Sequence, residues 1–283
     1  MKVIVNLLKF IFIIILTICL IAISLIKIVS LTVLNKNYIL QKLEETDFYS
    51  DTYKLVESNF ENYIYQSGFD EDVLKNICTQ EKVKKDINII ISNIYDGTEQ
   101  NIDTTEIANN LNTNIDKLGI KNKQNENAIN QFVVHICNEY TDTVLHTQYE
   151  NKVNNVYQKV INILNKIYNI LIIAIIIDLI AIIITNKKNV SKNIQSLGIS
   201  LLASSIFEGL VCLIIKSKIN IQGIKVFNDT FSKTLVTIIE EILQKINLIS
   251  LTTCIIAIMF IIIYVLIMTN KKTKDKPIEN EAK

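Results

Sequence analysis

The sequence contains no arginine and no tryptophan, and Pro277 is its single proline. All 29 basic side chains are therefore lysines, and the planar guanidinium group that binds phosphate through two parallel hydrogen bonds is missing. This composition argues against a protein that binds nucleic acid.

Catalytic signatures are missing as well. The chain has no nucleophile–base pair at a meaningful spacing, no Gly-rich phosphate loop and no recognisable metal-binding motif. The segments expected in the cytoplasm are too short to form a core of their own. We therefore expect no enzyme activity and no cofactor.

The chain does have four long apolar runs. Each is close to the roughly 20 residues that a helix needs to cross the hydrocarbon core of a bilayer. The sequence therefore predicts a multi-pass protein of the cell (plasma) membrane, in contact with the lipid bilayer. The expected segments are a cytoplasmic N-terminus (1–9), transmembrane helix 1 (10–34), an extracytoplasmic helical domain (35–167), transmembrane helix 2 (168–185), a cytoplasmic turn (186–193), transmembrane helix 3 (194–215), an extracytoplasmic loop and amphipathic helix (216–247), transmembrane helix 4 (248–268) and a cytoplasmic tail (269–283).

The distribution of lysines sets the expected orientation. The segments before residue 10, between residues 185 and 195, and after residue 268 together hold 10 Lys against 3 acidic residues, whereas residues 35–167 hold 13 Lys against 20 acidic residues. Cytoplasmic loops carry an excess of Lys and Arg, so both termini are expected in the cytoplasm. Lys216, Lys218 and Lys225, after the third run, oppose this orientation.

The first apolar run is expected to remain as a signal anchor. The apolar region of a cleaved signal peptide spans only about 7–15 residues. Here it continues past the small residues Ala22 and Ser24 to Leu34. Cleavage near Ser24 stays open as the alternative.

Residues 35–167 show helical periodicity throughout. Apolar residues recur every three or four positions in successive stretches, and a glycine suited to a left-handed helix end follows each stretch. Three such stretches and their glycines are 53–64 with Gly68, 83–94 with Gly97, and 107–118 with Gly119. Asp103 and Glu106 have the spacing of a capping box. The fold class is expected to be all-α: a four-helix transmembrane bundle with an extracytoplasmic α-helical domain between the first and second spans.

Two helices are expected to run from this outer domain into the membrane. No helix breaker follows Asn125 for about sixty residues, which predicts one continuous helix into the second span. Before the fourth run, a second apolar stripe is expected to pack against the outer domain. Its residues are Leu235, Ile238, Ile239, Ile242 and Ile246.

The outer domain contains two of the five cysteines, Cys78 and Cys137. Disulfides persist on the extracytoplasmic side of a membrane, so this pair is a possible disulfide. A single pair carries no framework pattern, however. Two buried free thiols are the favoured alternative.

A row of polar side chains follows one face of the last outer helix. Its members, at helical spacing, are His135, Glu139, Asp142, His146 and Glu150. Histidine and carboxylate can bind a divalent metal if a facing helix adds ligands, which makes His135, Glu139 and His146 the metal candidates. The apolar face of the same helix points about 120° away by the 3.6-residue period, so the row is expected to face water.

Three charged residues fall inside the apolar runs: Asp178, Glu208 and Lys27. A carboxylate near the bilayer centre costs about 2.5–3.5 kcal/mol or more, so it normally faces the interior of the bundle. By the rise of about 1.5 Å per residue, Asp178 and Glu208 lie at different depths. Lys27 is expected either to pair with Glu208 or to extend to the outer surface. The two acids are candidates for a structural hydrogen-bonding role, for an ion path or for a subunit contact.

Two functional classes are consistent with this layout. The first is an envelope sensor, scaffold or partner-binding subunit that acts through its outer domain, together with another membrane or envelope protein. The second is a small transporter, channel or permease component that uses the intramembrane carboxylates. The length and helicity of the outer domain are similar to those of bacterial chemoreceptors and sensor kinases, but no kinase or signalling coiled coil follows the second span.

Lys-rich turns and Ile-rich spans surround an Asn-rich helical domain in this chain. In these features it resembles uncharacterised four-span membrane proteins of AT-rich Gram-positive bacteria. The resemblance rests on composition and layout, and it implies no activity.

Overall fold

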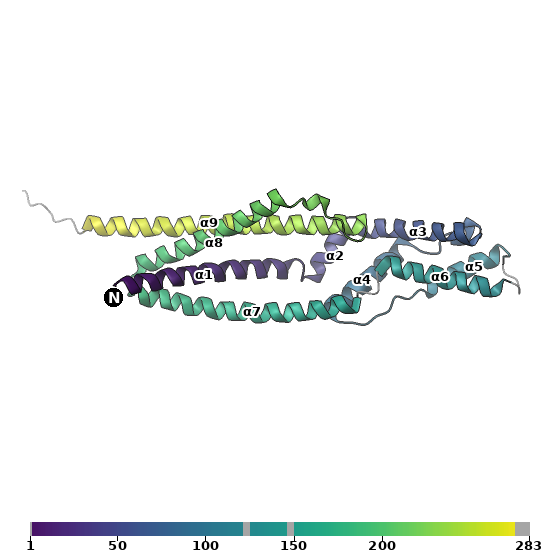
Figure 1. The fold of residues 1–283 in the computed structure, drawn as a ribbon, viewed down its shortest axis with the longest axis horizontal. Coiled ribbons are helices and arrows are strands. Elements are labelled where there is room, and N and C mark those ends of the chain that lie inside the picture. The colour runs from purple at the N-terminus through teal and green to yellow at the C-terminus, as the bar shows by residue number, and fades with distance from the viewer. Residues whose placement is uncertain (1, 121–124, 146–149, 275–283) are drawn as a thin grey trace, which may run out of the picture. The chain divides into compact units, whose positions relative to one another are not determined.

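The computed structural model describes residues 2–120, 125–145 and 150–274, and it is all-α (Figure 1). The described part of the chain is mostly helical and forms no strand, which confirms the expected all-α class. The elements are α1 (Lys2–Leu31), α2 (Lys36–Glu45), α3 (Phe48–Ser67), η1 (Glu71–Leu74), α4 (Gln80–Asp96), α5 (Thr105–Lys117), α6 (Glu126–Leu145), α7 (Glu150–Thr185), α8 (Val190–Lys218), η3 (Ile221–Gly223) and α9 (Asp229–Lys274).

The chain divides into two compact units. The apolar unit comprises Met1–Leu31, Ile163–Gly223 and Ile239–Lys283, and the polar unit comprises Thr32–Asn162 and Ile224–Ile238. Helices α7 and α9 each contribute residues to both units.

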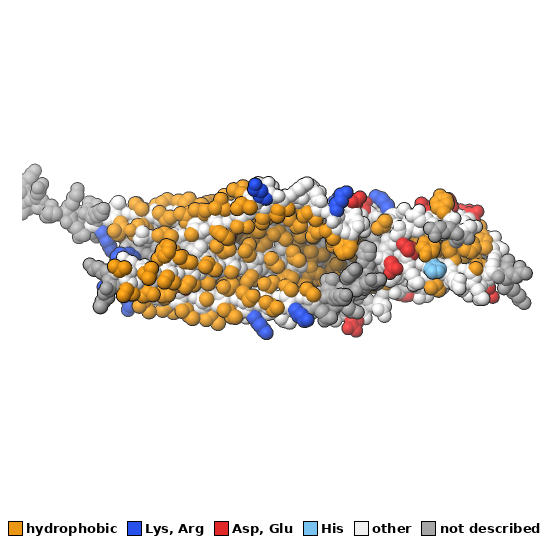
Figure 2. Space-filling model, viewed as in Figure 1, with side chains coloured by type: hydrophobic (Ala, Val, Ile, Leu, Met, Phe, Trp, Pro, Cys, Tyr) orange, Lys and Arg blue, Asp and Glu red, His pale blue; other side chains and the backbone are white. Residues whose placement is uncertain are grey.

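Among the described residues, four helices are long and apolar enough to cross a membrane. The candidate spans are Val3–Leu31, Val156–Thr185, Val190–Lys218 and Asp229–Lys271. Their large apolar side chains are mostly exposed, and they cover the visible face of this part of the molecule in Figure 2. Such a surface suits lipid rather than water, as in a multi-pass membrane protein.

The boundaries of the spans differ from the apolar runs. The first span was expected at 10–34, but α1 begins at Lys2 and ends at Leu31, and residues 32–34 form a turn. Asn35 then caps α2, because its side-chain oxygen accepts a hydrogen bond from the backbone N–H of Tyr38. The polar unit therefore begins with this three-residue turn, directly after the first span.

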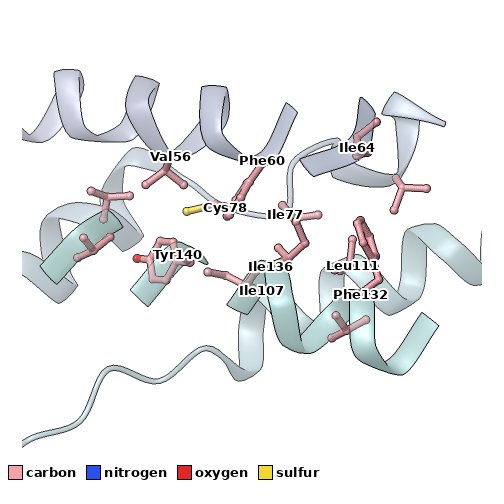
Figure 3. Packing of buried hydrophobic residues seen from close by; sticks show 14 of the residues in the cluster. Val56, Phe60, Ile64, Ile77, Cys78, Ile107, Leu111, Phe132, Ile136 and Tyr140 are labelled. Carbon is pink, nitrogen blue, oxygen red and sulfur yellow. The ribbon is translucent and has the colours of Figure 1, made fainter. Parts of the chain in front are cut away.

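The polar unit has its own hydrophobic core, built mainly by α3, α4, α5 and α6 with η1 (Figure 3). One face of each helix supplies it, as the apolar periodicity predicted. The most completely buried of these side chains are Val56, Val73, Ile77, Val83, Ile107, Leu111, Ile115, Ile129, Ile136 and Tyr140.

The helix ends follow the glycine pattern closely. Gly68 and Gly97 close α3 and α4 with left-handed backbone φ values of 72° and 69°. Gly119 follows α5 with φ 64°, and the N–H of Ile120 reaches back to the carbonyl of Ile115, as in a Schellman motif.

The start of α5 differs from the predicted capping box. The helix begins at Thr105, and Asp103 Oδ1 accepts a hydrogen bond from the backbone N–H of Thr105 at 2.9 Å. Asp103 therefore makes an Asx-type turn one residue before the cap position. A hydrogen bond from the Thr105 hydroxyl, followed by this backbone bond, lowers the pKa of Asp103.

The long helix predicted from Asn125 into the second span is described as two helices. α6 ends at Leu145 and α7 begins at Glu150. Residues 146–149 lie outside the described part, so the continuity of a sixty-residue helix stays a prediction. α7 alone still runs for 36 residues.

The first turns of α9 pack against the polar unit. The hydroxyls of Thr234 and Thr46 lie 2.8 Å apart in a buried contact, and Lys233 Nζ lies 3.7 Å from Asp47 Oδ2. Ser232 and Val236 are buried nearby. Of the expected stripe, Leu235 and Ile238 belong to this unit and are half-buried, whereas Ile239, Ile242 and Ile246 belong to the apolar unit.

Candidate functional site

The interior face of α8 consists of small and polar residues. Its buried members are Ser191, Ser196, Gly198, Ser200, Ser204, Ser205, Glu208 and Cys212. A helix with this composition brings neighbouring backbones close together in a membrane. Both α1 and α9 contact α8 through residues of this face.

Towards α1, the contacts show two parallel helices. The Ser200 hydroxyl donates to the carbonyl of Ile13 at 3.3 Å, and further along the Ser24 hydroxyl donates to Glu208 Oε1. Residue numbers rise together along both helices, which is the expected arrangement when two spans start on the same side of a membrane.

Towards α9, the contacts run in the antiparallel sense. The Ser250 hydroxyl donates to the carbonyl of Ser205 at 2.8 Å, and the Cys212 thiol donates to the carbonyl of Leu243 at 3.3 Å. At Gly198, a Cβ atom would lie 3.1 Å from Ile261 Cγ1. The glycine therefore permits an approach that a larger residue would prevent.

Glu208 is hydrogen-bonded to a serine hydroxyl. The residue is only 4% exposed, and its Oε1 accepts the hydrogen bond from Ser24. Lys27, the possible ion-pair partner, is exposed and makes no ion pair within the described ranges. This geometry favours the alternative in which the lysine extends away from the bundle.

Asp178 on α7 is the least satisfied polar side chain in the apolar unit. Only 3% of it is exposed, and Oδ2 has no hydrogen-bond partner among the residues that the structure describes. The different depths of Asp178 and Glu208 stay a prediction from the helical rise.

The polar row on α6 is only partly described. His135 is exposed and stacks on Tyr63, with ring centroids 5.9 Å apart. His146 lies outside the described residues, as does the side chain of Glu150. Within the described part, no three His, Cys, Asp or Glu side chains converge on a position that could hold a metal ion.

Cys78 and Cys137 are both free thiols in the structure. Cys78 is buried beside Tyr140, and burial raises the pKa of its thiol to about 12 (Figure 3). The Cys137 thiol points instead to the carbonyl of Thr104, at 4.0 Å. The geometry therefore corresponds to the free-thiol alternative.

A buried polar cluster in the polar unit was missed from the sequence. Tyr140 donates to Asp86 Oδ2 at 2.6 Å, and Lys82 forms an ion pair with the same oxygen and lies over the Tyr140 ring. Burial, followed by the hydrogen bond to Asp86, raises the pKa of Tyr140. The available signal was Asp86 itself, which falls on the same helical face as the apolar residues Val83 and Ile87.

A polar pocket of about 450 Å³ lies between η1 and α5. Four of its lining residues, Asn110, Thr113, Asn114 and Lys117, follow i, i+3, i+4, i+7 spacing on α5. The Asn114 amide donates to the carbonyls of Val73 and Lys75, which holds the two sides together. The rest of the lining is Asp72, Lys75, Asn76 and Leu118. The polar face of α5 was the sequence signal for this pocket.

No protein-family model, no curated protein and no solved structure matches this chain. The interpretation of its sites therefore rests on their geometry alone.

Proposed function

We propose that the protein is an envelope sensor, scaffold or partner-binding subunit of the cell membrane, that it acts through its polar unit, and that it is not an enzyme. In this proposal both termini and the α7–α8 turn lie in the cytoplasm, and the polar unit lies outside. The lysines beside the spans support this orientation. The expected partner is another membrane or envelope protein.

The observation that carries the proposal is that α7 and α9 belong to both units. Thr234 of α9 is held against Thr46 in the polar unit, and the same helix continues through the candidate span to Lys271. On α7, the Tyr157 hydroxyl donates to the carbonyl of Leu34, and its ring packs on Tyr95. A partner bound to the polar unit therefore has two helices through which to affect the spans.

The polar pocket between η1 and α5 is the proposed contact region. It offers amide, hydroxyl and ammonium groups, with a single carboxylate, Asp72. Lys75 and Lys117 give the lining a net positive charge at neutral pH. Such a lining favours a partner that presents acidic or hydrogen-bond-accepting groups.

The orientation is tested with single cysteines in a variant whose native cysteines are replaced. Lys54 on the polar unit and Lys188 in the α7–α8 turn are both exposed. In intact cells, a membrane-impermeant maleimide should label Lys54→Cys, whereas Lys188→Cys should be labelled only after the membrane is permeabilised. Labelling of Lys188→Cys in intact cells would reject the orientation.

The partner is tested by photo-cross-linking in cells. A photoreactive amino acid at Thr113 or Lys117 should give an adduct of the same mass at both positions. The same residue at Ala203, an exposed position on α8, should not give it. If neither pocket position gives a specific protein adduct in cells, the partner-binding proposal is wrong.

The second candidate function, a small transporter or channel component, rests on Asp178. A carboxylate oxygen buried without a hydrogen-bond partner in an apolar bundle is unusual unless it exchanges a proton or binds a cation. Proton and cation flux should then be measurable in liposomes, and Asp178→Asn should abolish it. Glu208→Gln is the matched comparison, because the Ser24 hydrogen bond already satisfies that carboxyl group. The absence of flux from correctly assembled protein would reject this function.

A further inference from the structure

A second pocket, of about 580 Å³, lies wholly within the apolar unit. It is formed where α8 ends, by the short helix η3, and by residues 240–244 of α9. This end of α8 is the one remote from the α7–α8 turn. The lining residues are Lys216, Ser217, Lys218, Ile219, Asn220, Ile221, Gln222, Glu240, Leu243 and Gln244.

The charges of this pocket are unbalanced. Lys216 and Lys218 both line it, both are exposed, and neither makes an ion pair in the parts of the chain that are described. The single carboxylate, Glu240, accepts a hydrogen bond from the side chain of Gln222 at 2.7 Å. Two ammonium groups therefore face the cavity beside one carboxylate that already has a donor.

The position of the lysines also runs against the usual charge distribution. Lysines favour the cytoplasmic ends of spans, yet these two follow the end of α8 that is opposite the lysine-rich turn. Their attraction to the carbonyl end of the helix is favourable but weak, because both side chains are exposed to solvent. A ligand in the adjoining pocket provides a further reason for their position.

The surface next to the pocket is apolar. One turn before Lys216 and Lys218, the α8 residues Leu213 and Ile214 are 64% and 57% exposed. They belong to a candidate membrane span, and a pocket at the end of a span would lie near the lipid head groups. A ligand with an anionic head and an acyl tail would satisfy both surfaces together.

We propose that this pocket binds the phosphate head group of an anionic phospholipid. Lys216 and Lys218 contact the phosphate, the side-chain amides of Asn220 and Gln244 offer further hydrogen-bond donors, and the acyl chains follow Leu213 and Ile214. Basic pockets between transmembrane helices bind anionic head groups in this way. Free inorganic phosphate shares the head-group chemistry, but it would leave the apolar surface unused.

Native mass spectrometry of the full chain, released from detergent supplemented with phosphatidylglycerol or phosphatidylcholine, tests this proposal. The wild type should retain phosphatidylglycerol adducts in preference to phosphatidylcholine. The double variant Lys216→Gln/Lys218→Gln should lose at least two-thirds of the phosphatidylglycerol adduct. The double variant Lys54→Gln/Lys225→Gln removes the same charge outside the pocket, and it should bind as the wild type does.

A misfolded variant would also lose bound phosphatidylglycerol, so a second variant is chosen that is expected to bind more of it. Glu240→Gln removes the one carboxylate from the lining, so it should increase the retained phosphatidylglycerol about two-fold. Equal adducts in all four proteins, or equal retention of both lipids, would overturn the proposal. Displacement of the lipid by millimolar inorganic phosphate would assign the site to free phosphate and would overturn the lipid assignment.

Discussion

Asp86 is a carboxylate with 1% exposure in the core of the polar unit, and two donors, Lys82 and Tyr140, reach the same oxygen. A buried charge is tolerated only when it is paired and hydrogen-bonded. The cluster therefore couples α4 to α6 at one defined register. The cluster contributes this defined register rather than extra stability. Three apolar side chains of similar volume would pack at the same place without the cost of desolvating charged groups.

Replacing Tyr140 with Phe is expected to destabilise the polar unit. The ring volume is kept, but Asp86 loses its hydroxyl donor, which costs about 1–3 kcal/mol for a buried group. Chemical denaturation of the full chain in detergent, followed by far-UV circular dichroism, measures the change. Tyr65→Phe is the control, because Tyr65 is exposed. Equal midpoints for the two variants would show that the hydrogen bond contributes nothing measurable.

The Cys78 thiol should be almost inert while the protein is folded. Its pKa rises from 9.0 to about 12 through burial, and only the thiolate reacts with alkylating reagents. At pH 8 the folded protein should therefore be alkylated at Cys78 about 1,000-fold more slowly than the unfolded chain. Peptide mass spectrometry after iodoacetamide treatment resolves Cys78 from the other cysteines. Comparable rates before and after unfolding would contradict the buried position.

The same shift predicts how stability depends on pH. The folded state holds the thiol proton more tightly than the unfolded state, because the folded pKa is the higher one. This contribution to the free energy of unfolding is complete below pH 9, and it is lost as the pH rises from 9 towards 12. Cys78→Ala should reduce the slope of stability against pH in that window.

At the scale of elements, close packing in the apolar unit depends on the small-residue face of α8. Side-chain hydroxyls of Ser200, Ser24 and Ser250 reach carbonyls or a carboxyl group on neighbouring helices. Apolar side chains gain little from one another inside lipid, so van der Waals packing and these hydrogen bonds must hold the helices together.

Enlarging Gly198 should weaken the contact between α8 and α9. A Cβ atom would lie 3.1 Å from Ile261 and 3.3 Å from Phe260, so Gly198→Leu should destabilise the apolar unit by about 1–3 kcal/mol. The control is Ala203→Leu, at an exposed position on the same helix. Thermal unfolding in detergent should show a lower midpoint for the first variant only. If the unfolding midpoint of the Ala203→Leu control fell by the same amount, the loss of stability would come from the changed helix composition and not from the contact at Gly198.

Element type was predictable from the sequence wherever one periodicity dominated. The apolar runs and the 3.6-residue pattern gave the helices, and Gly68, Gly97 and Gly119 gave their ends. Asp86 and the polar face of α5 were visible in the sequence, but the partners of these groups were not predictable, and neither was the pairing of Ser24 with Glu208. These pairings depend on which helices pack against each other. The helical periodicity identifies the buried face of a helix, but it does not identify the helix that packs against that face.

At the scale of the whole molecule, the proposed orientation depends on two opposed groups of lysines. Lys187 and Lys188 lie in the α7–α8 turn with Lys192 close behind, and Lys216 and Lys218 lie at the other end of α8. Each group favours its own side as cytoplasmic. The first group must prevail, together with the lysines near both termini, if the polar unit is to lie outside.

Removing the first group should therefore produce a mixed population. In the variant Lys187→Gln/Lys188→Gln/Lys192→Gln, part of the protein should insert with the turn outside. An impermeant maleimide should then label Asn193→Cys in intact cells. The matched variant Lys216→Gln/Lys218→Gln/Lys225→Gln should leave this cysteine protected, because it removes only opposing charge. Protection in both variants would mean that the termini alone set the orientation, and the lysines of the turn would then need another explanation.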